Sequence, residues 1–222
     1  MNLALAGLSY GITVVALALL TVRTKKLIGI YKKGQPDSTR GNDKAQRFRM
    51  ALAEIFGHTK MFNFTVVGFA HWFVMVGFFI LFGTLVTAYG QLIDPHFALP
   101  FIGHFWVYEY ITELIAWATG IGIVALIGIR QVTYRRNKRS RFAGSGMGKA
   151  YYVEFTIVLI VVCVIALRGL EGALSDETAW NRHFITTWFI AAMFKSMTLG
   201  QLENWIQIVA AIKIVGSMAW FI

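Results

Sequence analysis

The residue with the clearest chemical potential is His71, which lies in the apolar, aromatic stretch of residues 68–73. An ionisable side chain at membrane depth is rare unless it has a function. A neutral imidazole in such surroundings is a common axial ligand of b-type haem, and nearby Gly68, Ala70 and Gly77 leave room for a flat macrocycle. The position predicts a haem ligand. A histidine bonded to a neighbouring helix and a proton relay are the alternatives.

Lys213 is the second candidate, because it lies in the middle of the last apolar stretch of the chain. Counting residues inward from the opposite membrane face places it near the level of His71. A lysine at that depth needs an anionic or acceptor partner. We expect a haem propionate, a quinone carbonyl or a carboxylate, or else a backbone carbonyl of a neighbouring helix.

Two further charged residues, Glu113 and Arg168, fall about one turn inside the membrane face opposite the basic segments. An ion pair that joins their helices is the economical interpretation. Arg168 is also a candidate partner of a haem propionate or a quinone. Glu154 lies near the other face, where we expect it to pair with a basic loop that begins at Arg130.

The other histidines are weaker candidates. His58 precedes His71 by thirteen positions and lies beside Lys60, which favours an interfacial role with a quinone contact as the lesser option. His183 opens a short apolar segment, where it either contacts a quinone headgroup or is a loop histidine. Histidines at 96 and 104 are expected in a solvated loop. The single cysteine at 163 excludes a four-cysteine cluster within this chain.

Five apolar stretches are long enough to carry these residues across a membrane, since a spanning helix needs about 20 residues. The predicted fold is therefore an all-α membrane domain of five transmembrane helices with short interfacial helices, one near 43–56 and one within 184–197. The predicted spans are residues 3–22, 62–89, 107–129, 150–170 and 202–222.

Cations are concentrated in two connections, since 17 of the 21 Lys and Arg residues lie in segments 23–60 and 130–149. This distribution follows the positive-inside bias of bacterial inner-membrane proteins. It predicts that the N-terminus faces outward and the C-terminus inward, with lipid rather than nucleic acid as the partner of the charge. The chain has no phosphate-binding glycine loop, paired catalytic carboxylates or nucleophile triad, so transfer of electrons or protons is the chemistry that remains.

The chain resembles a known membrane domain in two sequences, the histidine stretch of residues 68–78 and the run Tyr89-Gly90-Gln91-Leu92-Ile93-Asp94-Pro95 with its continuation at 100–103. Together with five spans, these look like the N-terminal membrane domain of heterodisulfide-reductase-like iron–sulfur oxidoreductases of actinobacteria. That family is related to the nitrate reductase gamma subunit and other five-helix cytochrome b anchors.

The resemblance implies electron transfer between a quinone pool, here menaquinone, and cytoplasmic iron–sulfur clusters that follow in the same polypeptide after residue 222. It implies that His71 ligates haem b and that partner histidines lie on the fifth helix. That helix has none within the sequence, which leaves a ligand beyond Ile222, an absent haem, or Lys213 or Met218 as a substitute ligand.

The sequence therefore predicts a membrane anchor that passes electrons between quinone and an iron–sulfur domain or subunit, within a larger respiratory assembly. A haem-free anchor that docks partners through its basic face is one alternative. A small transporter or channel lined by Lys213, Glu113 and His71 is the other, although the chain lacks the internal repeat and paired broken helices of many transporters.

Overall fold

The computed structural model describes residues 2–35, 41–63, 65–136 and 147–221, without the side chains of 134–136. Within these ranges all regular structure is helical, which confirms the predicted fold class. The α-helices are α1 (Leu3–Tyr31), α2 (Lys44–Gly57), α3 (Thr65–Gln91), α4 (Trp106–Arg136), α5 (Met147–Leu174), α6 (Trp188–Met193) and α7 (Leu199–Met218). Two short 3₁₀ helices follow α2 and α7, η2 (Met61–Asn63) and η3 (Ala219–Phe221).

Five of these helices (α1, α3, α4, α5 and α7 with η3) are long and apolar enough to cross a membrane. They correspond to the five predicted spans, so the chain has the character of a multi-pass membrane protein. Helix α1 continues beyond the predicted end at Val22, and α4 beyond Ile129. The additional turns carry cations such as Arg23, Lys25 and Arg130, and long basic side chains extend from a helix towards the polar interface.

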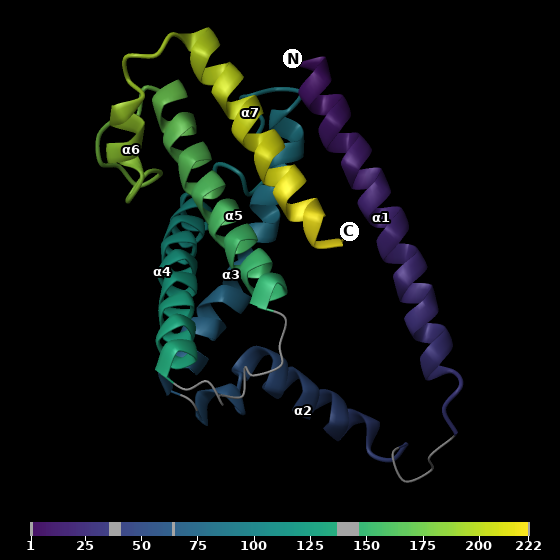
Figure 1. The fold of residues 1–222 in the computed structure, drawn as a ribbon. Coiled ribbons are helices and arrows are strands. Elements are labelled where there is room, and N and C mark those ends of the chain that lie inside the picture. Colours follow the sequence, from purple (N-terminus) through teal and green to yellow (C-terminus); the bar gives the residue numbers. More distant parts are fainter. Residues whose placement is uncertain (1, 36–40, 64, 137–146, 222) are drawn as a thin grey trace.

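The bundle has two chemically different ends, which Figure 1 shows at its top and bottom. The acidic end comprises the N-terminus, the loops 92–105 and 175–187, α6, and the adjoining turns of the spans. It holds seven of the eleven acidic residues: Asp94, Glu109, Glu113, Glu171, Asp176, Glu177 and Glu203. The basic end comprises α2, η2, the C-terminal turns of α1 and α4, and the N-terminal turn of α5, which are the described parts of the two cationic segments and their surroundings.

Small residues set the spacing of α3 and α4, which pack along much of their length. A Cβ atom on Gly77 would overlap Thr119 Oγ1, and one on Gly122 would meet the Ala70 carbonyl oxygen at 2.9 Å. Helices in membranes associate through such close backbone approach, since lipid offers no hydrophobic drive. The two helices therefore form a rigid pair.

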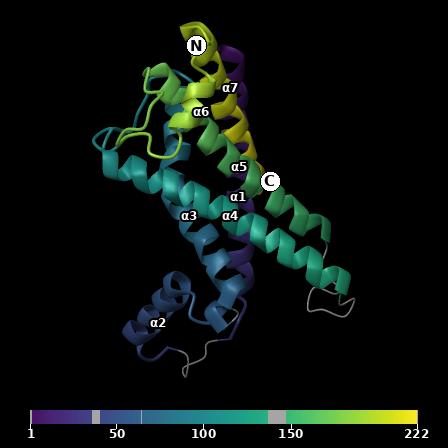
Figure 2. The same ribbon diagram turned by 90° about the vertical axis from the view of Figure 1, so that its left-hand side faces the viewer.

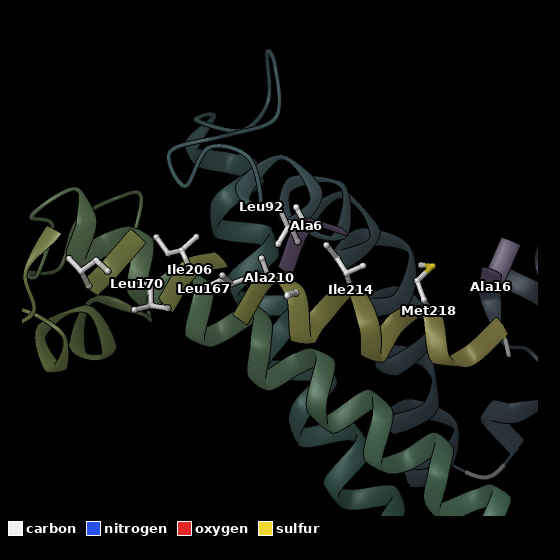
Figure 3. Close-up of a cluster of buried hydrophobic side chains, with 12 residues drawn as sticks. Ala6, Ala16, Leu92, Leu167, Leu170, Ile206, Ala210, Ile214 and Met218 are labelled. Atoms are coloured by element: carbon white, nitrogen blue, oxygen red, sulfur yellow. The ribbon is translucent and has the colours of Figure 1, made fainter. Parts of the chain in front are cut away.

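Helix α7 lies at the centre of the acidic half of the bundle, where it packs against α1, α3 and α5. Its apolar face includes Ile206, Ala210 and Ile214, each fully buried in the larger core cluster (Figure 3). The cluster also takes Ala6 from α1 and Leu92 from the end of α3. This core anchors the N-terminal half of α1 to the bundle.

The basic end is loosely packed by comparison. Beyond Ala16 no residue of α1 is buried, and Figure 1 shows α1 turning away from the other helices towards its C-terminal end. Helix α2 has no buried residue and extends away from the bundle in Figure 2. It corresponds to the interfacial helix predicted near 43–56. The apolar segment 184–197 contains only the short α6, which confirms that it does not span the bundle.

Candidate functional site

A polar cavity of about 380 Å³ extends from the loops of the acidic end into the interior of the bundle. Its mouth is formed by residues of the loops 92–105 and 175–187, including His104 and Glu177. Its walls come from α3, α4 and α5, and Lys213 of α7 also lines it. A cavity with a few convergent polar groups between helices is a typical site for a small organic ligand.

Lys213 is 1% exposed, and Thr84 supplies its two hydrogen-bond acceptors. The ammonium Nζ donates to the Thr84 carbonyl oxygen at 2.8 Å and to Thr84 Oγ1 at 2.7 Å. The threonine hydroxyl in turn donates to the Leu81 carbonyl oxygen. An ammonium group has three N–H donors, so one donor remains for a ligand in the cavity. A backbone carbonyl, the alternative expected from the sequence, is thus one of the partners.

The depth predicted for Lys213 is wrong. Its partner Thr84 follows His71 by thirteen residues in α3, about 20 Å along the helix axis at 1.5 Å per residue. Side chains on a helix lean towards its N-terminus, and the N-terminus of α7 lies at the acidic end. The ammonium therefore reaches towards the cavity mouth rather than towards the level of His71.

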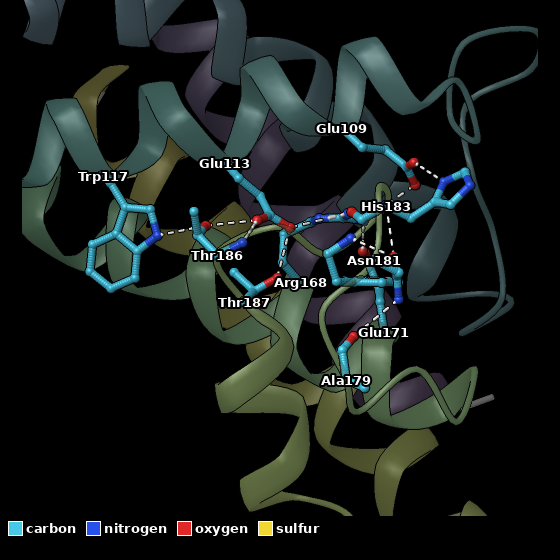
Figure 4. Close-up of polar contacts among 11 residues, drawn as sticks. Glu109, Glu113, Trp117, Arg168, Glu171, Ala179, Asn181, His183, Thr186 and Thr187 are labelled. Atoms are coloured by element: carbon cyan, nitrogen blue, oxygen red, sulfur yellow. Dashed lines mark hydrogen bonds and ion pairs between the residues drawn. The ribbon is translucent and has the colours of Figure 1, made fainter.

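Arg168 is the centre of a buried network of carboxylates in the cavity wall (Figure 4). Its guanidinium lies 2.9 Å from Glu171 Oε2, 3.4 Å from Glu113 Oε1 and 3.6 Å from Glu109 Oε1. It also stacks over the Phe184 ring, 4.4 Å from the ring centroid. The predicted pair of Arg168 and Glu113 is confirmed, and two further carboxylates join it.

Glu113 fastens the loop before α6 to α4. Its carboxylate accepts from the Thr186 backbone N–H at 2.8 Å, from Thr186 Oγ1 at 2.7 Å and from Thr187 Oγ1 at 2.7 Å. Trp117, which lies on α4 like Glu113, donates from Nε1 to the Thr186 hydroxyl (Figure 4). With four partners including Arg168, this 2% exposed carboxylate has a structural role.

His183 is held over the cavity by Glu109, whose Oε2 lies 2.6 Å from the imidazole Nδ1. On the other side of the guanidinium, Glu171 Oε1 accepts from Gln91 Nε2 at 2.6 Å. Glu109, Gln91 and Glu171 were not among the site residues predicted from the sequence. The spacing of Glu109 and Glu113, four residues apart on one helix face, is the signal that would have grouped them.

Two buried hydroxyl groups line the same cavity. Thr112 is 2% exposed, and the hydroxyls of Thr112 and Tyr108 have at most each other as partners among the described residues. The Tyr108 hydroxyl lies against Gly83, where a Cβ atom would be 2.5 Å from it. Gly83 precedes Thr84, so this hydroxyl and the Lys213 ammonium contact adjacent residues of α3. They form a pair of donors that face one ligand volume.

A second feature, at the basic end, joins His58 to His71. The His58 Nε2 atom lies 2.9 Å from His71 Nδ1, and His58 Nδ1 lies 3.0 Å from the Ile55 carbonyl oxygen. Because a carbonyl only accepts, His58 Nδ1 carries the proton and its Nε2 accepts from His71 Nδ1–H. This arrangement leaves His71 Nε2 unprotonated and available as a ligand atom.

One continuous helix through both histidines would place them about 140° apart around its axis, but α2 ends at Gly57 and α3 begins only at Thr65. His58 follows α2 in a left-handed conformation with φ of 47°, and η2 then turns the chain into α3. A Cβ atom on Gly68 would overlap the Met61 carbonyl oxygen, so glycine allows the turn to pack against α3. The Phe56 carbonyl also accepts from Trp72 Nε1 at 2.9 Å.

The remaining candidates have ordinary surroundings. Cys163 is buried, and Met218 belongs to the larger core cluster. His96 lies 3.5 Å from Glu203, and both side chains are exposed. Glu154 lies 3.1 Å from Arg130, as predicted for a residue facing the basic loop.

The residues at His71 fit one half of a haem site. Its free Nε2, oriented through the other ring nitrogen, is the arrangement of a ligating histidine, and His58 takes the place of the usual outer partner. Within the described residues no group of three or more His, Cys, Asp or Glu side chains is suited to a metal ion. His96 and His183 lie at the acidic end, so they offer no second axial ligand. Neither a protein-family model, nor a curated protein, nor a solved structure matches the chain.

Proposed function

We propose that the chain is the membrane part of a quinone-linked electron carrier and that its cavity binds the quinone headgroup. The observation that carries the proposal is the pair of donors from Lys213 and Tyr108 inside a cavity of about 380 Å³. A quinone headgroup is a flat, mostly apolar ring with carbonyl oxygens that only accept. The cavity matches this chemistry, since Leu167 and Val164 supply apolar wall beside the donors.

Arg168 and His183 serve this site in different ways. Arg168 is bonded to three carboxylates and donates to the His183 carbonyl oxygen. It therefore holds α4, α5 and the loop before α6 together in the cavity wall. His183 lines the cavity and offers its imidazole to the ligand. Both residues lie at the end of the bundle away from His71. Their proposed role is therefore at the quinone site rather than as partners of haem propionates.

His71 is the proposed ligand of haem b, which supplies one-electron exchange when it is bound. The cavity floor at Thr84 lies about 20 Å along α3 from His71, so a quinone in the cavity cannot touch a partner at the basic end. An intermediate carrier is required between them. The role of His58 is to fix the tautomer of His71 and to keep its Nε2 directed away from protein acceptors.

The basic end is proposed to face the cytoplasm of a bacterium, with the acidic end outside, according to the positive-inside bias. Exposed cations then surround the surface nearest His71, among them Lys44, Arg49 and Lys60. This surface suits an iron–sulfur domain or subunit together with anionic lipid headgroups. Menaquinone is the proposed quinone, and a larger respiratory assembly is the proposed setting.

Binding of menadione, a soluble naphthoquinone, to the purified protein tests the cavity. We expect menadione to quench tryptophan fluorescence in a saturable manner and Lys213→Met to weaken the affinity at least about tenfold, the loss of one charge-assisted hydrogen bond. Lys195→Met is the matched control, because Lys195 is exposed at the same end of the protein. Equal affinities of the two variants would refute the site.

An optical spectrum distinguishes a haem-free anchor from the proposed electron carrier. A haem-free anchor would show no Soret band, and its menadione binding would be unchanged. The transporter alternative draws on the same cavity, which opens at one end and reaches Lys213 in the interior. No residue of the basic end lines the cavity among the described residues. Solute flux in proteoliposomes that is lost in Lys213→Met would favour that alternative over the carrier.

A further inference from the structure

The contact of Glu109 with His183 has the form of a carboxylate that orients an imidazole. Glu109 is 5% exposed and accepts from His183 Nδ1–H at 2.6 Å (Figure 4). The opposite ring nitrogen, Nε2, accepts a long 3.3 Å bond from Arg182 Nε. The imidazole is thus neutral, with its proton on the Glu109 side and a weakly engaged lone pair at Nε2. This is the arrangement by which a carboxylate prepares a histidine to act as a base.

The carboxylate of Glu109 serves His183 more closely than it serves Arg168. Three carboxylates, Glu109, Glu113 and Glu171, surround the guanidinium of Arg168 in this wall, while Lys213 lines the same cavity and Arg182 contacts His183. Glu109 Oε2 lies 2.6 Å from His183 Nδ1, whereas Glu109 Oε1 lies 3.6 Å from Arg168. The nearest partner of Glu109 is therefore His183, and its carboxylate is a ready counter-ion for an imidazolium that forms at this position.

The cavity also connects His183 with the surface, so a proton taken up by its imidazole can reach water. His183 and Glu109 line it together with Lys213 below, and with Ser175 and Glu177 at the mouth. The buried hydroxyl of Thr112 in the same wall has at most the Tyr108 hydroxyl as a partner among the described residues, which leaves hydrogen-bonding capacity for a polar ligand between these groups. Because the mouth opens at the acidic end, protons taken from that ligand leave on that side of the membrane.

We propose that His183 is the base that accepts protons from a quinol bound in the cavity, and that Glu109 positions it. The inference rests on the proposed quinone function. Oxidation of one quinol yields one quinone, two protons and two electrons. Each proton passes from a quinol oxygen to His183 Nε2 and then to water at the mouth. The electrons pass singly to two oxidised iron centres, either haem or iron–sulfur.

The test measures the oxidation of menadiol by ferricyanide, a one-electron iron acceptor, in the presence of the purified protein and after subtraction of the uncatalysed rate. Wild type is compared with Glu109→Gln, Glu109→Asp and His183→Asn across pH 5–9. We expect His183→Asn to lower the rate on the order of 100-fold, as for loss of a general base. Glu109→Gln should lower it at least about tenfold and change the pH profile, and Glu109→Asp should restore part of the rate.

Glu203→Gln is the matched control, since Glu203 also contacts a histidine at the acidic end but lies outside the cavity. The titratable and charged groups that line the cavity or lie beside the pair are Arg168, Glu171, Glu113, Arg182, Glu177, Lys213, Tyr108, His96 and His104. They are unchanged in every variant, so a change in the profile reports on Glu109 and His183.

Menadione binding, followed by tryptophan fluorescence, separates the two proposals. Variants that bind menadione like wild type but oxidise menadiol slowly support the assignment of His183 as the base. Variants that bind normally and keep both the rate and the pH profile overturn it and leave the quinone site standing. A wild-type protein that does not bind menadione refutes the quinone site and the base together.

Discussion

The acidic end of the bundle and α2 at the basic end use charged residues in opposite ways. At the acidic end the side chains of Arg168 and Glu113 are only 11% and 1% exposed and are bonded to several partners in the wall of a cavity. At the basic end the Lys60 and Glu54 side chains are 78% and 42% exposed, and α2 has no buried residue. Buried charges hold one geometry because each needs its partners, whereas exposed charges leave a surface adaptable.

The largest effect is expected from Glu113→Gln. The change removes a buried carboxylate that accepts from both Thr186 and Thr187 and lies beside Arg168, so we expect a loss of about 3 kcal/mol in the free energy of unfolding. Unfolding in mixed detergent micelles measures it. Glu203→Gln, at the exposed edge of the same end, should change stability by less than about 0.5 kcal/mol. Equal losses of unfolding free energy in the two variants would show that burial does not distinguish Glu113 from Glu203.

His58→Ala tests whether the basic end contains an ordered site despite its loose packing. The change removes the acceptor of His71 Nδ1–H, and loss of such an outer partner weakens a metal–histidine bond about 10–100-fold. Haem occupancy, measured by pyridine haemochrome, should fall while menadione binding at the acidic end stays constant. A fall in both would mean that the two ends are not independent.

Gly77→Ala tests the helix pair that connects the ends. A Cβ atom there would overlap Thr119 Oγ1, so the α3–α4 spacing must widen or the threonine must rotate, at a cost of about 1 kcal/mol. Gly128→Ala is the control, because a Cβ atom on Gly128 meets nothing within 4 Å. Unfolding curves that coincide for the two variants would contradict the close packing.

The smallest effect is expected at the exposed pair of Lys60 and Glu54, which lie 2.9 Å apart. Glu54→Gln should cost between 0 and about 1 kcal/mol, because solvent screens exposed charges. The loss should also shrink at high ionic strength. A loss as large as that of Glu113→Gln would remove the contrast between the two ends.

The five spans and α2 could be predicted because hydropathy and charge placement act over whole segments. The pairs Glu113–Arg168 and Glu154–Arg130 could be predicted as well, since a buried charge needs a partner at its own depth. These inferences depend only on how far each residue lies from the membrane face. They do not depend on how the helices pack against one another.

Features that depend on chain direction or on packing could not be predicted. The contact of His58 with His71 arises where α2 ends and η2 reverses the chain, which a continuous helical periodicity misses. The depth of Lys213 was misjudged because α3, with 27 residues and a length of about 40 Å, is longer than the hydrocarbon core of about 30 Å, and because the lysine side chain leans towards the N-terminus of α7. Gln91 and Glu109 join the site only because α3, α4 and α5 pack together around one cavity.

Helix α1 is fixed to the bundle at one end only, since none of its residues after Ala16 is buried. Its 29 residues are about 44 Å long, more than the hydrocarbon thickness of about 30 Å. The inclination of its free half is therefore set by bilayer thickness. Thicker bilayers should decrease the tilt of this half and thinner bilayers should increase it. Spin labels at Leu19 and Lys26 would record the change in tilt.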